Sequence, residues 1–357
     1  MGEVPGNGEE IRMSGTNPPY GGSGQLPAMP DDDGTPQRPL RELDFMDVII
    51  SERGDAKLRG LEGAEGPLVD APACVLDDLD RLHRLVCDKG QTQAEFFMDF
   101  DGMRFRVART PDVEGTWYIL RRAIWPIPRM GQLTGLSPLV IRCLGNLGQP
   151  GRHGLVIIAG AAANGKTTTA CSLLQEYLLH YGDIAVALED PPELPLSGKH
   201  GQFGQCFQIN VENSNFEEAM ERTMRRSPRY ILLGEVRSPG AASQALRAAI
   251  NGHLVITTIH AGSVVEAINA MLKFVSGREP MSLAQGILAD GLAGVVHQQL
   301  VRSRGRSGGR MLKIECLFPG NDKGIRSLIR GGKTEQLSTN ISQQATRVSQ
   351  GRLPIEE

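Results

Sequence analysis

The chain has 357 residues, of which 40% are hydrophobic and 22% are charged. These proportions are ordinary for a soluble globular protein, and the length favours about two domains. The formal net charge of −3 gives no basic excess, which excludes a protein that binds nucleic acid through bulk positive charge. Aromatic residues make up only 5%, so we expect an aliphatic interior.

We divide the chain into four parts: a disordered tail at 1–38, a small α+β domain at 39–130, a larger α/β domain at 131–342, and a C-terminal tail at 343–357. The first tail is dominated by glycine, proline and polar residues, which bury too little surface to offset the entropy lost on ordering. In the small domain we expect a strand at Phe45–Ser51 and a helix whose leucines recur from Leu76. Asp101-Gly102 is typical of a two-residue hairpin turn.

The larger domain alternates apolar, strand-like runs with helical patterns. The runs are Leu155–Ile158, Ile184–Leu188, Cys206–Val211, Tyr230–Leu233 and Leu254–Thr258. Continuous apolar strands separated by helices indicate a mainly parallel sheet that is buried on both faces. Capping-box patterns at Ser214, Ser263 and Ser282 mark expected helix starts.

Cysteine usage and the N-terminus indicate a cellular location. The six cysteines form no Cys-x-x-Cys pair, so we interpret them as reduced thiols of a cytosolic protein rather than zinc ligands. The N-terminus lacks the basic-then-apolar start of a signal peptide. The longest apolar runs, such as Leu155–Ala163, are too short to span a bilayer. We therefore expect a cytoplasmic protein that contacts a membrane only through partners.

A phosphate-binding loop is the strongest motif. Gly160–Thr167 fits the Walker A pattern G-x-x-x-x-G-K-[ST] and lies between an expected strand and an expected helix. In that setting backbone amides and the helix N-terminus bind phosphate, Lys166 contacts the β- and γ-phosphates, and the Thr167 hydroxyl binds Mg²⁺. The alternative is a chance glycine-rich turn. The expected ATP-binding residues are Gly160, Ala161, Ala162, Ala163, Asn164, Gly165, Lys166, Thr167 and Thr168.

Acidic groups follow two expected strands, at Glu189–Glu193 and at Glu235, where α/β sheets place their ligands. Hydrolysis of ATP needs such carboxylates to position water and to complete the Mg²⁺ shell. The alternatives are a solvated acidic loop for the first and a helix cap for the second. His253 and His260 flank an extended segment and stand too far apart to share a metal ion, so a phosphate-sensing role fits better.

Four segments, in order, resemble the motifs of the PilT/GspE-type secretion and pilus ATPases. They are Gly160–Thr168, Ala187–Glu193 (family T-I-E-D-P-I-E), Ile231–Arg237 (I-L-V-G-E-x-R) and Gly252–His260 (G-H-L-V-x-x-T-x-H). The likeness extends to Val295–Val301 (V-x-x-Q-x-L), Gly324–Lys333 and Met103–Val107, and it covers about residues 43–342. The resemblance implies a RecA-like P-loop NTPase core with a smaller, PAS-like N-terminal domain.

The resemblance also implies site residues and partners. Glu235 would be the principal catalytic glutamate, Glu193 would assist it, and His260 would sense the γ-phosphate. Arg106 and Arg122 would offer their guanidinium groups to nucleotide within a ring. The implied protein is an ATP-hydrolysing homohexamer with ATP and Mg²⁺ as cofactors. It would drive a type IV pilus, type II/IV secretion or conjugation machine through an inner-membrane platform or secretion-channel protein.

Several positions depart from the family motifs. Ala162-Ala163-Asn164 stands where the family prefers Thr-Gly-Ser, Ser227-Pro-Arg229 replaces Asp-Pro-Asp, and Ser238 replaces an acid. These changes favour a divergent branch similar to the DotB/TraJ-like ATPases of type IVB secretion and conjugation. Two other functions stay open: a nucleotide-binding scaffold with weak hydrolysis, and a nucleic-acid-stimulated RecA-like ATPase. The acidic charge and the lack of aromatic stacking positions count against direct nucleic-acid binding.

Overall fold

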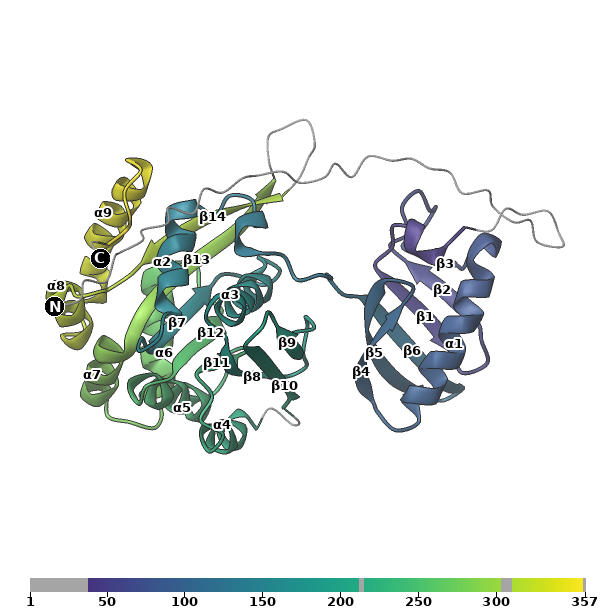
Figure 1. Ribbon diagram of the computed structural model, residues 1–357, viewed down its shortest axis with the longest axis horizontal. Helices are drawn as coiled ribbons and strands as arrows, with labels where there is room; N and C mark the ends of the chain where they lie inside the picture. The colour runs from purple at the N-terminus through teal and green to yellow at the C-terminus, as the bar shows by residue number, and fades with distance from the viewer. Residues whose placement is uncertain (1–37, 212–214, 303–309, 356–357) are drawn as a thin grey trace, which may run out of the picture.

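The computed structural model describes residues 38–211, 215–302 and 310–355, which form two domains joined by one connecting segment (Figure 1). Each domain is built around its own sheet, of six strands in the smaller domain and eight in the larger one. The expected disordered tail at 1–38 lies, apart from its last residue, outside the described residues. Within the described ranges, no helix combines the length and the apolar character that a membrane crossing needs.

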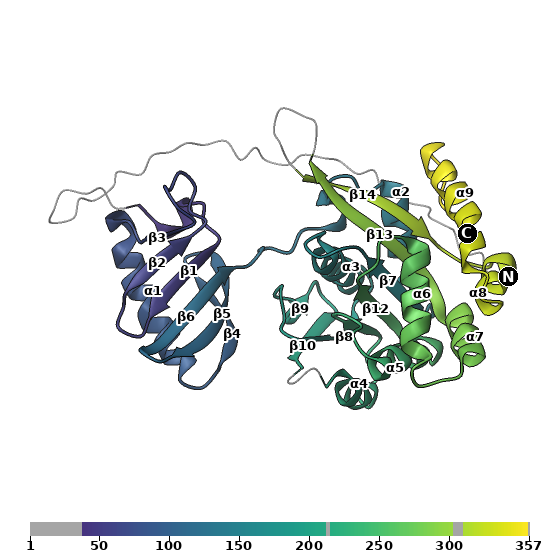
Figure 2. The same cartoon turned by 180° about the vertical axis from the view of Figure 1, so that it is seen from behind.

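The smaller domain is an antiparallel sheet with one long helix on one face. Its elements are β1 (Asp47–Ser51), β2 (Ala56–Arg59), β3 (Leu68–Asp70), α1 (Leu76–Gly90), β4 (Glu95–Phe100), β5 (Met103–Asp112) and β6 (Gly115–Arg122). The strands lie in the order β3-β2-β1-β6-β5-β4. Leu79, Leu82 and Val86 of α1 are buried in this domain's core. The opposite face of the sheet turns toward the larger domain (Figures 1 and 2).

The predicted hairpin in this domain is confirmed. Asp101 and Gly102 have φ values of 47° and 75°, and Phe100 pairs directly with Met103. Two central residues with positive φ define a turn whose twist matches that of the flanking strands. Of the predicted helical face, Leu79, Leu82 and Val86 are buried, whereas Leu76, at the first position of the helix, and Leu85 are exposed.

The larger domain is a mainly parallel sheet, as predicted. Its elements are α2 (Pro138–Leu147), β7 (Gly154–Ala159), α3 (Lys166–Tyr181), β8 (Asp183–Glu189), β9 (Gly198–His200), β10 (Gly204–Asn210), α4 (Phe216–Met224), β11 (Tyr230–Leu233), α5 (Pro239–Ile250), β12 (Leu254–Ile259), α6 (Val264–Val275), α7 (Met281–Gly291), β13 (Leu292–Arg302), β14 (Arg310–Leu317), α8 (Lys323–Arg330) and α9 (Leu337–Ser349). The strand order is β14-β13-β7-β12-β11-β8-β10-β9. Only the edge strands β14 and β9 pair antiparallel with their neighbours.

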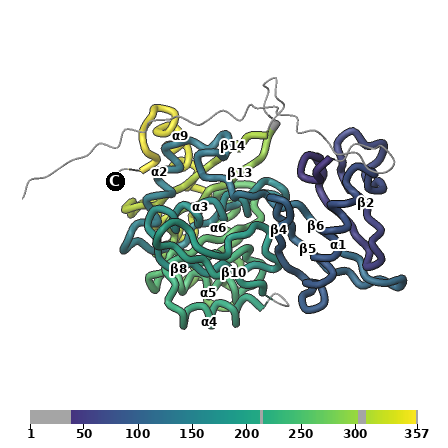
Figure 3. Tube along the Cα trace, turned by 45° about the vertical axis from the view of Figure 1, so that its right-hand side comes forward, coloured from purple at the N-terminus to yellow at the C-terminus, as the bar shows by residue number. Residues whose placement is uncertain are grey.

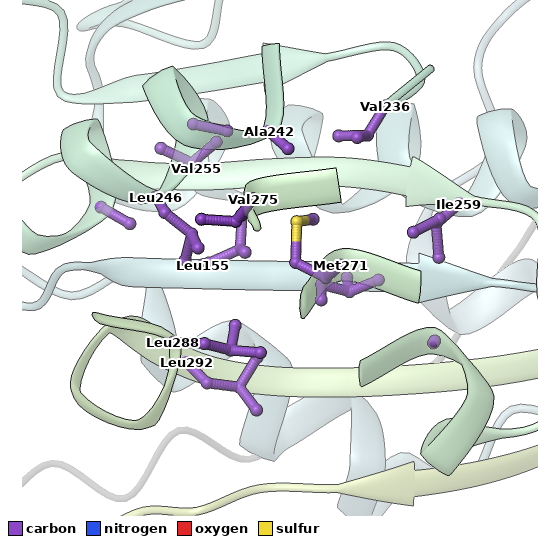
Figure 4. Close-up of a cluster of buried hydrophobic side chains, with 14 of the residues drawn as sticks. Leu155, Val236, Ala242, Leu246, Val255, Ile259, Met271, Val275, Leu288 and Leu292 are labelled. Atoms are coloured by element: carbon purple, nitrogen blue, oxygen red, sulfur yellow. The ribbon is translucent and has the colours of Figure 1, made fainter. Parts of the chain in front are cut away.

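Successive residues of the central strands face two separate cores. Leu155 and Ile157 of β7 belong to a cluster with side chains of α5, α6 and α7, part of which Figure 4 shows. Val156 and Ile158 belong to a second cluster with α2 and α3. Burial on both faces explains why these strands are continuously apolar rather than alternating.

The boundary regions differ in part from the expectation. Ile127 and Met130, on the small-domain side of the expected boundary at 131, already pack in the larger domain's core. The expected C-terminal tail from residue 343 begins within α9, which continues to Ser349. The buried Gln344 amide in α9 bonds to both backbone polar groups of Phe318. Figures 1 and 3 show α9 on the side of the domain away from α4.

The predicted helix starts have three outcomes. Ser263 caps α6, and its Oγ accepts a hydrogen bond from the Glu266 N–H at 3.1 Å, which confirms that prediction. Ser282 is wrong as a cap, because α7 begins one residue earlier, after Pro280. Ser214 lies outside the described residues, and α4 is capped by Asn215.

Candidate active site

A cavity of about 460 Å³ lies beyond the carboxyl ends of the parallel strands β7, β8, β11 and β12. Open α/β sheets bind their ligands at this edge. Its lining residues are Ile124, Ala162, Ala163, Asn164, Gly165, Lys166, Thr167, Thr168, Glu189, Asp190, Pro191, Glu193, Phe216, Gly234, Glu235, Arg237, Thr258, His260 and Leu300. The sequence-predicted loop from Ala162 to Thr168 and the side chains of Glu193, Glu235 and His260 are therefore brought together. Gly160 and Ala161 support the loop without lining the cavity.

Glycines shape the loop between β7 and α3. Gly165 precedes the first turn of α3 with φ of 76°, a conformation that glycine adopts without a steric penalty. At Gly160, a Cβ atom would lie 2.5 Å from the carbonyl oxygen of Gln298, so no larger residue fits. Ala163 has φ of 59° although it carries a side chain, which places strain in the loop. The result is a helix N-terminus with free amides at the edge of the cavity.

Lys166 bends back toward its own loop. Its Nζ donates a hydrogen bond to the carbonyl oxygen of Ala161 at 3.0 Å and lies 3.5 Å from Nδ1 of His260. Burial lowers the pKa of Lys166, while the charges of Glu235 and Glu193 act in the opposite direction. An anion bound in the cavity would therefore stabilise the charged form of this lysine.

Glu235 follows β11 and is held from two sides. Its Oε1 lies 3.1 Å from Nε2 of His260, and its Oε2 accepts hydrogen bonds from Nε and the terminal guanidinium nitrogen of Arg237 at 2.9 and 2.7 Å. Because Nδ1 of His260 faces the ammonium of Lys166, the hydrogen-bond network assigns the imidazole proton to Nε2, which donates to Glu235. The carboxylate is thus oriented at the cavity wall by fixed donors.

The acidic segment from Glu189, the last residue of β8, to Glu193 contributes a buried carboxyl and an exposed one. Glu189 lies 3% exposed and accepts a hydrogen bond from the Gln208 amide at 2.7 Å. Burial raises the pKa of Glu189 to about 7, and the Gln208 bond opposes that rise. The same amide donates to the carbonyl oxygen of Leu194 at 2.7 Å, which anchors the segment that carries Glu193. The cavity therefore has a carboxyl that titrates near neutral pH.

Arg106 and Arg122, the two site arginines predicted in the smaller domain, do not line the cavity of their own chain. Phe105 pairs with Arg122 and Arg106 pairs with Arg121, so the two predicted arginines project from opposite faces of the sheet. Arg122 donates a hydrogen bond to the carbonyl oxygen of Leu43 at 3.2 Å. A contact of either arginine with this cavity therefore requires a second subunit or a domain movement.

Sequence reasoning left several lining residues off the site, Phe216 and Gly234 among them. Arg237 and Thr258 belong to motifs that were recognised, and Thr258 supports the β11 loop by donating to the carbonyl oxygen of Gly234 at 2.6 Å. Leu300 belongs to the V-x-x-Q-x-L segment. Ile124 lies in the connecting segment between the domains, and no motif marks it.

Two residues at departures from the family motifs have structural roles. Ser238 caps α5 by accepting a hydrogen bond from the Ala241 N–H at 3.3 Å. Arg229 donates to the carbonyl oxygen of Gly148 at 3.1 Å and stacks on Tyr230. His253, which matches the family motif, immediately precedes β12, and His260 immediately follows that strand. The side chains of Ser238, Arg229 and His253 do not line the described cavity.

Comparison with known proteins finds one family over most of the chain. Residues 77–355 match the type II/IV secretion system protein family. The protein transport protein HofB homolog of Escherichia coli is 30% identical over 245 residues, 66% of this chain and 48% of that protein. The type IV pilus retraction ATPase PilT of Pseudomonas aeruginosa is 32% identical over 191 residues, 53% of each chain. The chain spans about half the length of these relatives.

Two solved structures share the fold. The pilus retraction motor PilT with bound ADP aligns with a TM-score of 0.67 and 25% identity, covering 84% of this chain and 86% of that one. The Legionella pneumophila ATPase DotB aligns with a TM-score of 0.63 and 21% identity, covering 87% and 89%. The predicted fold class, an α/β RecA-like core with a smaller N-terminal domain, is thereby confirmed.

Proposed function

Because this chain belongs to the type II/IV secretion system protein family, we propose that it is an ATP-hydrolysing hexameric motor of a pilus, secretion or conjugation machine. The observation that carries the proposal is the position of Glu235. It lies at the wall of the loop cavity, oriented by His260 and Arg237. A carboxylate fixed beside a phosphate-binding loop is the arrangement that nucleotide hydrolysis needs.

Different cavity residues bind the phosphates and take part in hydrolysis. The amides of the loop and the Lys166 ammonium bind the phosphates of ATP. Glu235 orients the attacking water and accepts its proton, with Glu193 as an assisting carboxylate. His260 bridges Lys166 and Glu235, so it responds to a γ-phosphate that draws Lys166 away.

The donor set at the cavity fits Mg²⁺. Thr167 supplies a hydroxyl, and the neighbouring carboxyls are hard oxygen ligands of the kind this ion prefers. We therefore include Mg²⁺ with ATP as a cofactor, held through Thr167 and the phosphates. When bound, the ion would neutralise part of the phosphate charge.

Assembly and location form the wider part of the proposal. Arg106 and Arg122 lie outside the cavity of their own chain, which supports a ring in which the N-terminal domain reaches another nucleotide. The protein would act in the cytoplasm, against an inner-membrane platform or secretion-channel protein, without direct nucleic-acid binding. Light scattering with and without ATP measures the molar mass and so shows whether the chain forms a hexamer. A monomer under both conditions contradicts it.

A phosphate-release assay tests the enzymatic claim. The purified wild-type chain should release phosphate from Mg-ATP, and Lys166→Ala should reduce the rate to background because the charged contact to the phosphates is lost. Lys199→Ala is the matched control, since Lys199 is exposed on β9, away from the cavity. Equal rates in wild type and Lys166→Ala would disprove the assigned site.

A nucleotide-binding scaffold with weak hydrolysis is the second candidate. The left-handed conformation of Ala163, in a loop where the family prefers glycine, favours it. Measured binding of ATP without phosphate release above the Glu235→Gln background would select the scaffold over the motor.

A further inference from the structure

The phosphate-binding loop is tied to β13 at Asn164. The side-chain Nε2 of Gln298 donates a hydrogen bond to the Asn164 carbonyl oxygen at 2.7 Å, and the Leu300 N–H donates to Asn164 Oδ1 at 2.8 Å. Pairing of β13 with β7 ends at the pair His297 and Ala159. Beyond that pair, the loop takes the place of the neighbouring strand along this edge of β13.

The Gln298 bond fixes the orientation of one peptide unit. The peptide between Asn164 and Gly165 is trans, so its C=O and N–H point in opposite directions. With the carbonyl held against Gln298, the Gly165 N–H points to the other side of the loop. Gly165 and Lys166 line the cavity, and an amide directed there binds phosphate.

The loop has a competing conformation that this bond suppresses. A half-turn of the peptide would take φ of Gly165 from 76° to about −104°, and glycine accepts both values. The turned peptide would present a carbonyl oxygen to the phosphate in place of an amide. The partial negative charge of the carbonyl oxygen would then face the negatively charged phosphate, and nucleotide affinity would fall.

Burial of Gln298 leaves one of its polar atoms without a hydrogen bond in the part of the chain that the structure describes. Its side chain is fully buried, and its Oε1 atom has no hydrogen-bond partner among the described residues. An unpartnered buried amide oxygen is unfavourable, and an apolar side chain of similar size avoids that penalty. A buried side chain that leaves its oxygen unpartnered while its nitrogen holds the phosphate-binding loop points to a role in function.

We propose that Gln298 is a positioning residue for nucleotide binding. It holds the Asn164-Gly165 peptide so that the Gly165 amide faces the bound phosphate. The proposal rests on the proposed function, since it requires that this loop binds nucleotide. Gln298 itself acts through the peptide and does not line the cavity.

The test measures binding of a fluorescent ADP analogue with Mg²⁺ to the full chain. Gln298→Met keeps the length of the side chain and removes the donor, and we expect the Kd to rise about tenfold. The melting temperature without nucleotide should change little, because removal of the unpartnered oxygen offsets the loss of the bond to the Asn164 carbonyl. Gln299→Met is the matched control: the same change one residue on, at an exposed position of β13.

A second variant probes the peptide orientation directly. Gln298→Glu places a carboxylate against the Asn164 carbonyl, which favours the turned peptide, so its Kd should exceed that of Gln298→Met. Wild-type affinity in both variants overturns the proposal. So does a loss of affinity that merely follows a lower melting temperature, which would mark a role in stability alone. A wild-type chain that binds no analogue would instead refute the proposed function.

Discussion

Two carboxylates, one in each domain, are held by basic side chains, yet their surroundings differ. Asp47 begins β1, is fully buried, and forms ion pairs with Arg59 and Arg121. Glu235 follows β11 and is held by Arg237 and His260. Its side chain is 20% exposed and faces a cavity. The first arrangement links three neighbouring strands of a sheet, whereas the second leaves room for a ligand.

The direction of the strands explains the difference. In the antiparallel sheet, neighbouring strands end on opposite sides, so their polar ends are dispersed. In the larger sheet, β7, β8, β11 and β12 end at one edge and bring their following loops to one cavity. The same kind of ion pair is therefore structural in one domain and available for chemistry in the other.

The largest expected effect is on turnover. Glu235→Gln keeps the shape of the side chain and removes its charge, so the phosphate-release rate should fall about 100- to 1000-fold while nucleotide affinity is retained. Steady-state phosphate release and analogue binding measure the two quantities. Asp47→Asn, the same change in the N-terminal domain, should leave affinity unaltered. If both variants slow release equally, the contrast between the two carboxylates fails.

The buried Glu189 should make stability depend on pH. Its pKa of about 7 in the folded chain lies above the ordinary value of 4.5, so the folded state binds the proton more tightly. The resulting stability is full below pH 4.5 and is lost as the pH rises to about 7. The loss amounts to about 3 kcal/mol. Glu189→Gln should remove this dependence, so that it matches wild type near pH 5 and melts higher at pH 8.

A carboxyl with the opposite environment serves as the control for Glu189. Burial favours the neutral form of Glu176, but the hydrogen bonds and charge of Arg129 outweigh burial and lower its pKa. Glu176→Gln should therefore reduce stability at pH 8, where Glu189→Gln raises it. Melting curves of both variants that shift in the same direction at pH 8 would contradict this account.

Removal of the structural carboxylate should weaken the smaller domain. Asp47→Ala leaves Arg59 and Arg121 without their shared partner, and we expect a loss of about 2 kcal/mol in the free energy of unfolding. Asp99→Ala removes an exposed partner of Arg104 and should cost less than about 1 kcal/mol. Urea unfolding measures both. A change in nucleotide affinity in Asp47→Ala would show that its ion pairs are not purely structural.

The smallest expected effect concerns the loop strain. Ala163→Gly relieves the left-handed conformation, a gain partly offset by the greater freedom of glycine in the unfolded chain. We expect a net stabilisation of up to about 1 kcal/mol, measured as a higher melting temperature. A lower melting temperature would mean that the Ala163 methyl group makes packing contacts worth more than the strain.

The sequence predicted what is encoded locally. The apolar runs located β7, β8, β11 and β12, and the motifs located Lys166, Glu193, Glu235 and His260 at their ends. Strands β2 and β3 were missed because they are short and weakly apolar, so pairing with β1 defines them rather than their own pattern. The contact of Gln298 with Asn164 joins residues 134 positions apart, and Ile124 reaches the cavity from a connecting segment. Such placements depend on how distant segments assemble around the sheet, which the spacing of residues within one segment does not reveal.

The edges of the larger sheet have a consequence for solubility. At one edge, β9 is only three residues long, and at the other, the carbonyl oxygen of Thr134 accepts a hydrogen bond from the Leu312 N–H of β14 at 2.7 Å. A short edge and an occupied edge give foreign strands little main chain to pair with. Main-chain pairing between copies of this chain is therefore disfavoured at these two edges of the larger sheet.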